Sequence, residues 1–465
     1  MYRIKPEQRE KFESFVQEIM REQRAEGLAV ALVTADDGTA YEKFFGCRDL
    51  KKGLPVNGDT IFGLASITKS FTSLSIMQLA EKGIIDIYAP IQRYIPSFAF
   101  PNILVWHFMS HCAGFFPLSR ILVANVAAEM GITQEKDGDF AYNERLADEG
   151  ERLVTERLSS QNKFTGKPGE YFSYCNDGYA ILSAIIKKYG GEKTYSDYVK
   201  KHILLPLGME RSGCDFLYPF KDDNVTRLYM GRSDDKRIDT DDYCDNAFVL
   251  MGGGGIKSTL NNMKKYITMY LNNGRTPEGK LIAKAESIRE MIKPRISVGI
   301  NSVYGLGLDT CVMDDLKLYG HGGGLTGVSS QFFFSYEAGA GVIVLCNTSD
   351  VTSEKIALAA IRMLRNKDID RNDDIYTETE WSEEQLNAVC GEYISGEGST
   401  TLVYRKDGGI IIKLDNDEHN AVPVNPYTLR IKVDNTVKLF KVYKNENEEV
   451  RALSVGIRMV PKSPK

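Results

Sequence analysis

The sequence predicts an α/β domain with a helical insertion, followed by a small all-β domain. Apolar, strand-like runs lie near both ends of the first part, at 28–34 and 39–46 and again at 331–336 and 341–347. Helix-like segments lie between these two pairs of runs, which indicates one α/β domain with an insertion. Further on, short alternating runs are separated by turn residues such as KDGG and KNENEE, as in a meander or barrel.

The elements of the first part can be assigned in chain order. Residues 7–25 have the periodicity of an amphipathic helix, and the turn residues ADDG join the first two strand-like runs into a hairpin. Residues 66–83 are predicted to form a buried helix that ends at Gly83, and residues 353–366 form another helix. The second pair of strand-like runs forms a hairpin around EAGA.

A change of composition divides the chain into three parts. Residues 1–367 are assigned to the α/β domain, the acidic and polar residues 368–380 to a linker, and residues 381–465 to the C-terminal β-barrel or meander. We expect the C-terminal domain to fold separately, and to limit access to any site in the first domain rather than to supply catalytic groups.

Composition and charge exclude several classes of partner. The chain has 58 Lys and Arg against 63 Asp and Glu, so no broad basic field for nucleic acid or anionic membrane is implied. No apolar run approaches the roughly 20 residues of a membrane span. The charged N-terminus has no apolar signal core, so we expect a cytoplasmic protein unless an export signal has been removed. The oligomeric state is not predicted.

The sequence does not indicate a metal or another cofactor. The eight cysteines are scattered without a CxxC pattern, and there is no HExxH. His107 and His111 are four residues apart and could share a helix face, but no carboxylate motif accompanies them. We therefore expect catalysis, if any, by side chains alone.

Ser66 and Lys69 form an S-x-x-K pattern at the head of the predicted helix over 66–83. A serine hydroxyl needs a base within hydrogen-bond reach to act as a nucleophile. Residues i and i+3 lie on the same helix face, so Lys69 can be that base. It must lose its proton to do so, which burial or a neighbouring positive charge favours.

The pattern alone is weak, because Ser160–Lys163 and Ser233–Lys236 also fit it. Both of these lie in polar, loop-like sequence. Ser66, in contrast, follows a strand-like run and opens a buried helix, where it gains from the positive end of the helix dipole. Its placement therefore favours Ser66 as the nucleophile.

Six segments resemble, in the same order, the serine β-lactamase and penicillin-binding-protein superfamily, above all its class C β-lactamase-like branch of D-peptidases and esterases. They are IFGLASITKSFTSLSIMQLAEKG (61–83), ILVWHFMSHCAGF (103–115), KPGEYFSYCNDGYAILSAII (167–186), MGGGGIKSTLNNMKKYITMYLNNG (251–274), YGLGLD (304–309) and GHGGGLTGVSSQFFFSY (320–336). The resemblance implies a β-lactamase-like antiparallel sheet flanked by helices.

The same resemblance implies the roles of the site residues. Ser66 would be the nucleophile and Lys69 its base. Tyr174, in the family's Y-x-N loop, would shuttle a proton between Ser66 and the leaving group. Asn176, in the same loop, would hold the substrate's acyl-side amide.

His321, Gly322 and Gly323 stand where other members of the superfamily carry Lys-Thr-Gly. His321 would support Tyr174 electrostatically or donate a hydrogen bond to the substrate. We expect its titration to produce a bend in the pH dependence of kcat/KM between about pH 5.5 and 7.5. The oxyanion hole would be formed on this strand, by the backbone N–H of Gly324, together with that of Ser66.

The departure from Lys-Thr-Gly also bears on the substrate, because the lysine and threonine hold a substrate carboxylate. The sequence therefore favours a serine hydrolase that forms an acyl-enzyme on a small amide, an ester, or a short peptide, including one with a D-residue. The alternatives are a carboxylesterase or acyltransferase, a penicillin-binding protein or weak β-lactamase, and a non-catalytic scaffold.

Each site residue also has a purely structural interpretation. Ser66 could be a helix N-cap and Lys69 a solvated helix residue. Tyr174 could be a core side chain, Asn176 a brace within its loop, and His321 a residue at the end of a strand.

Overall fold

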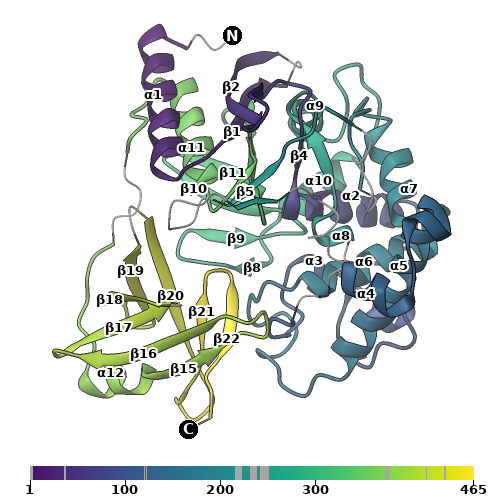
Figure 1. Cartoon of the computed structure of the whole chain (residues 1–465). Helices are drawn as coiled ribbons and strands as arrows, with labels where there is room; N and C mark the ends of the chain where they lie inside the picture. The colour runs from purple at the N-terminus through teal and green to yellow at the C-terminus, as the bar shows by residue number, and fades with distance from the viewer. Residues whose placement is uncertain are drawn as a thin grey trace. The chain divides into compact units, whose positions relative to one another are not determined.

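The computed structural model describes residues 4–35, 38–119, 121, 123–214, 222–230, 238–240, 251–371, 376–414, 416–433 and 436–464 (Figure 1). The chain forms two compact units. The first consists of Met1–Ser110, Ile121–Ser159 and Asn176–Asp370, and the second of His111–Arg120, Ser160–Cys175 and Arg371–Lys465. The second unit thus includes two segments from the middle of the sequence besides the C-terminal residues.

In the part of the chain that the structure describes, nine strands form the antiparallel sheet of the first unit. In spatial order they are β3 (Leu54–Pro55), β2 (Thr39–Asp49), β1 (Gly27–Thr34), β13 (Ala340–Cys346), β12 (Val328–Ser335), β11 (Leu316–Leu325), β10 (Asp309–Met313), β9 (Ser302–Tyr304) and β8 (Ile296–Ser297). β1 pairs with both β2 and β13, so the two predicted hairpins meet within one sheet. β1 and β13 are almost continuously apolar because helices cover both faces of the sheet.

The alternation of side chains along β12 shows how the two faces are covered. α1 (Pro6–Glu22) and α11 (Ser353–Leu364) lie side by side over one face, where Phe333 joins their apolar core (Figure 1). α9 (Leu260–Leu271) covers the other face, where Tyr270 stacks on Phe332 and Phe334. Successive strand residues point to opposite faces, so both layers of helices pack on the same strand.

The helical insertion lies between the two ends of this sheet in the sequence. Its helices and the short helices that follow are α2 (Thr68–Glu81), α3 (Val105–Met109), α4 (Val123–Met130), α5 (Gln134–Ser159), α6 (Asn176–Tyr189), α7 (Tyr195–Val199), α8 (Met251–Gly254) and α10 (Ala285–Ile292). Two small sheets accompany them, β4 (Ile61–Gly63) with β7 (Lys257–Thr259), and β14 (Thr348–Ser349) with β5 (Leu228–Met230) and β6 (Ile238–Thr240).

The C-terminal residues form an antiparallel meander. Its described strands are β15 (Gly391–Ile394), β16 (Thr400–Lys406), β17 (Gly409–Leu414), β18 (Asp417–Asn425), β19 (Thr428–Val433), β20 (Thr436–Lys444), β21 (Val450–Val455) and β22 (Arg458–Pro461), preceded by α12 (Glu383–Val389). A bridge between Tyr393 and Lys462 brings the first and last strands together, so the sheet nearly closes into a barrel. The predicted fold class, an α/β domain with a helical insertion and a small all-β domain, is confirmed.

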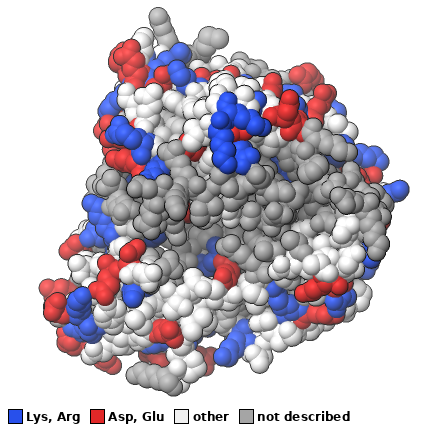
Figure 2. Space-filling view, in the orientation of Figure 1, with Lys and Arg blue, Asp and Glu red and all other residues white. Residues whose placement is uncertain are grey.

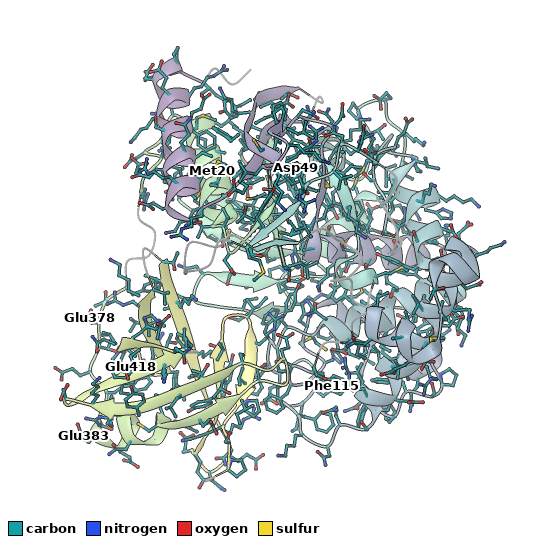
Figure 3. The ribbon with its side chains drawn as sticks, viewed as in Figure 1. Met20, Asp49, Phe115, Glu378, Glu383 and Glu418 are labelled. Carbon is teal, nitrogen blue, oxygen red and sulfur yellow. The ribbon has the colours of Figure 1, made fainter. Side chains whose placement is uncertain are left out.

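The outer surface of the meander carries paired charges. Glu383 Oε2 lies 2.9 Å from Arg405 Nη1, and Glu418 Oε2 lies 2.7 Å from Lys406 Nζ. Both glutamates are labelled in Figure 3. Such exposed pairs add little stability.

On the face of the molecule in Figure 2, described basic and acidic residues are interspersed. None of the described helices combines the length and the apolar character that crossing a membrane requires.

The two middle segments of the second unit pack on its last strands. Phe115, labelled in Figure 3, bridges to Phe164. The guanidinium of Arg451, on β21, lies 5.4 Å from the ring centroid of Tyr171 and donates to the carbonyl of Phe164 at 3.4 Å. The Tyr171 ring meets the Tyr443 ring edge to face at 5.5 Å. The meander and these segments therefore share one body.

Candidate active site

Ser66 lies in a tight turn between a strand and a helix. β4 leads into the 3₁₀ turn Ala65–Ile67, which continues as α2. Ala65 has φ +47°, a left-handed conformation that is uncommon for a residue with a Cβ. Such local strain is found at functional sites, where the surrounding structure holds it. The turn leaves Ser66 half-buried beside the first turn of α2.

Lys69 is fully buried one turn further along, and its Nζ lies 3.1 Å from Ser66 Oγ. The same Nζ donates to the carbonyl oxygen of Gly253 at 2.6 Å. It also lies 5.4 Å from the ring centroid of Tyr179 on α6. A buried side chain with these contacts has little freedom to move, so the nitrogen is held at the serine hydroxyl.

Asn176 begins α6 and belongs to the same cluster. A Cβ placed on Gly253 would lie 3.8 Å from Lys69 Nζ and 3.9 Å from Asn176 Oδ1. Gly253 therefore faces both side chains at ordinary contact distance. The structure brings Ser66, Lys69 and Asn176 together around this glycine.

β11 approaches the turn that carries Ser66 through its glycines. A Cβ on Gly323 would lie 2.2 Å from the carbonyl oxygen of Leu64 and 2.3 Å from Ser330 Oγ, so only glycine fits there. Ser330 Oγ donates to the same Leu64 oxygen at 3.0 Å. At Gly324, in contrast, a Cβ would meet nothing within 4 Å, so the space beside that residue is open.

His321 is buried in β11, and both of its ring nitrogens have hydrogen-bond partners within the protein. Nδ1 lies 2.5 Å from the carbonyl oxygen of Gly322, and Nε2 lies 2.8 Å from the hydroxyl of Tyr304. Desolvation, followed by the nearby charge of Lys69, lowers the pKa of His321 to about 3. The ring is therefore neutral and has one N–H. A carbonyl only accepts, so Nδ1 donates to Gly322 and Nε2 accepts from Tyr304.

This environment differs from the expectation for His321. The sequence suggested a charge that titrates near pH 6.5, or a donor to the substrate. The structure has a neutral ring whose N–H is given to Gly322, because burial penalises the imidazolium. The expected bend of the rate between pH 5.5 and 7.5 is not supported.

The rate should accordingly be insensitive to His321 titration in that range. With the pKa lowered from 6.5 to about 3, the folded protein carries a neutral ring at every pH above about 4. His321→Gln should lower kcat/KM by about 10–10³-fold, evenly from pH 5.5 to 7.5. The measurement is a pH–rate profile of both proteins on p-nitrophenyl acetate. A wild-type bend that the variant lacks would show that His321 titrates.

Tyr174 belongs to the second unit and is buried there. Its ring packs against that of His111, with 4.0 Å between centroids, and its backbone N–H donates to the carbonyl of Ile457 at 3.0 Å. His111 Nδ1 accepts from the N–H of Cys175 at 3.0 Å, which gives this histidine a structural contact within the Y-x-N loop.

The other sequence candidates lie elsewhere. Ser160 and Lys163 are exposed, in a stretch without a helix or strand, and Ser233–Lys236 lies outside the described residues. His107 Nδ1 accepts from the N–H of Leu104 at 3.0 Å. Within the described ranges, no three His, Cys, Asp or Glu side chains are grouped to hold a metal ion.

Sequence reasoning missed Tyr304, Tyr179 and Ser330 as members of this cluster. All three lie within the segments that carried the family resemblance, but no motif singled them out. Tyr304 in particular is the hydrogen-bond partner of His321, from a strand two places away in the sheet.

Comparisons with known proteins agree with this architecture. The Beta-lactamase family matches residues 12–365. Penicillin-binding protein 4* of Bacillus subtilis (strain 168) is 30% identical over 199 residues, which are 43% of this chain and 37% of that protein. Esterase EstB of Burkholderia gladioli is 29% identical over 202 residues, which are 42% of this chain and 48% of that protein. The chain thus spans less than half the length of either relative.

Solved structures also match nearly the whole chain. The octameric penicillin-binding protein homologue from Pyrococcus abyssi is 25% identical with a TM-score of 0.67, over 97% of this chain and 99% of that one. The family match covers most of the sequence, including the turn that carries Ser66. The chain belongs to the β-lactamase family.

Proposed function

We propose that the chain is a serine hydrolase that forms an acyl-enzyme on Ser66 from a small amide, peptide or ester. The observation that carries the proposal is the 3.1 Å separation between Lys69 Nζ and Ser66 Oγ at the head of α2. Removal of the serine proton by a general base needs a distance of this kind.

The proposed reaction has two halves. Lys69 in its neutral form takes the hydroxyl proton as Ser66 Oγ attacks the carbonyl carbon, and the N–H groups of Ser66 and Gly324 hold the oxyanion. The intermediate collapses with loss of the leaving group, which takes a proton from Tyr174. Asn176 holds the acyl-side amide. Water then attacks the acyl-enzyme and gives a proton to the Tyr174 phenolate, while Lys69 returns its proton to Ser66 Oγ as the acid leaves.

The surroundings of His321 support a substrate without a carboxylate at that place. A neutral imidazole with its N–H on Gly322 offers no cation, and Gly322 offers no hydroxyl. A β-lactam carboxylate would lack both contacts. Amides, short peptides with a D-residue and esters do not need them.

An esterase or acyltransferase is the second candidate, supported by the match to Esterase EstB. The ratio of rates on p-nitrophenyl acetate and D-alanyl p-nitroanilide separates the two. A penicillin-binding protein that acylates without deacylating would give a burst of p-nitrophenol without further turnover.

Covalent labelling tests the nucleophile directly. A fluorophosphonate should add one mass increment to the intact protein, and peptide mapping should place it on Ser66, because Lys69 activates that hydroxyl. Ser160 provides an internal comparison, since it also begins an S-x-x-K pattern but is exposed in irregular structure. An adduct on Ser160 or Ser233 in place of Ser66 would overturn the proposal.

A further inference from the structure

The β-hairpin of β21 and β22 holds the backbone around Tyr174. The N–H of Tyr174 donates to Ile457 at 3.0 Å, and the N–H of Met459 donates to Ser173 Oγ at 3.4 Å. Ile457 lies in a two-residue turn with Gly456, whose φ of +57° such turns require. Residues from the end of the sequence therefore fix the path of the chain through the Y-x-N loop.

The same hairpin also contacts the Tyr174 side chain. The guanidinium of Arg458 lies 5.1 Å from the ring centroid of Tyr174. Glu397 pairs with that guanidinium: its Oε1 accepts a hydrogen bond from Nη2 at 3.1 Å, and its Oε2 lies 2.6 Å from Nε as an ion pair. A charge-assisted hydrogen bond and an ion pair to one carboxylate restrict the movement of the guanidinium, which holds Arg458 beside the ring.

We propose that Arg458, on β22 of the C-terminal meander, is a positioning residue for Tyr174. The inference rests on the proposed function, in which Tyr174 protonates the leaving group. Proton transfer needs heavy atoms about 2.6–3.2 Å apart. Without Arg458, the Tyr174 hydroxyl would lie within that distance of the leaving group less often. The proposal goes beyond the expectation that the C-terminal domain limits access rather than supplying catalytic groups.

The test uses two leaving groups on the full-length protein. Nitroanilide cleavage needs a proton on the departing nitrogen, whereas p-nitrophenolate leaves without one. Arg458→Ala should lower kcat on D-alanyl p-nitroanilide by about 10–100-fold, a part of the 10²–10⁴-fold that general acid catalysis supplies. It should change kcat on p-nitrophenyl acetate by less than about threefold. A loss of folded protein would lower both rates together.

Arg451→Ala is the matched control. Arg451 lies in the same hairpin and its guanidinium also contacts a tyrosine ring, that of Tyr171. This variant should lower the melting temperature as Arg458→Ala does, but leave the ratio of the two rates unchanged. Arg458→Lys keeps the charge without the planar guanidinium and should recover part of the nitroanilide rate.

Tyr174→Phe distinguishes a failure of the proposed Tyr174 proton shuttle from a failure of the proposed role of Arg458. It should lower the nitroanilide rate selectively, and Arg458→Ala should add nothing in that background. If Tyr174→Phe leaves the ratio of rates unchanged, the proposed shuttle is wrong. If Tyr174→Phe changes the ratio but Arg458→Ala behaves like Arg451→Ala, the shuttle stands and the role of Arg458 is overturned.

Discussion

Ser66→Ala should abolish turnover while the protein stays folded. Where several residues act together in catalysis, removal of the nucleophile lowers kcat on the order of 10⁶-fold. The fold should survive because Ser66 is half-buried and its hydroxyl contacts Lys69 Nζ at the surface of the turn. The measurements are kcat on p-nitrophenyl acetate and a thermal melting curve.

Ser70→Ala is the matched control for this variant. Ser70 lies in the same helix, donates to the carbonyl of Ile67 at 2.7 Å and bonds the Tyr266 hydroxyl at 2.9 Å. Its removal should cost about 1–3 kcal/mol of stability, because buried partners lose their hydrogen bonds, and should spare most of the activity. Equal loss of activity in both variants would show that the loss comes from damage to the helix and not from removal of the nucleophile.

Lys69→Met should slow acylation by about 10²–10⁴-fold, the range of a general base. Methionine fills most of the buried volume but cannot accept the proton of Ser66. The rate to follow is fluorophosphonate labelling of Ser66, which reports acylation without turnover.

Lys265→Met serves as the comparison, since Lys265 Nζ also donates to a glycine carbonyl, that of Gly208, at 2.6 Å. It should label at the normal rate. A normal labelling rate for Lys69→Met as well would mean that another group takes the proton.

The fold class and the Ser66–Lys69 pair could be predicted because both depend on local patterns. Period-two and period-3.6 repeats located the hairpins and α11, and a spacing of three residues located the base. Even here the structure differs in detail. The helix was expected from residue 66, but α2 begins at Thr68, because the left-handed Ala65 and the 3₁₀ turn place Ser66 before it.

The surroundings of His321 could not be predicted in this way. Its neutrality follows from burial and from the nearby charge of Lys69. No pattern in the sequence links strands β9 and β11, which the hydrogen bond between Tyr304 and His321 joins. The close approach of Gly323 to Leu64 and the contact of Arg458 with Tyr174 likewise join residues that are far apart in the chain. Such contacts exist only after tertiary folding.

The hairpin that holds the Y-x-N loop has a consequence for synthesis on the ribosome. Ser173 and Met459 are separated by 286 residues, so the loop emerges long before its support is translated. At about 5–20 residues per second, that interval lasts roughly a quarter of a minute to a minute. During it the nascent chain contains Ser66 and Lys69 but not the hairpin whose backbone and Arg458 contact Tyr174. If the proposed role of Arg458 holds, the proposed activity would be complete only near the end of translation.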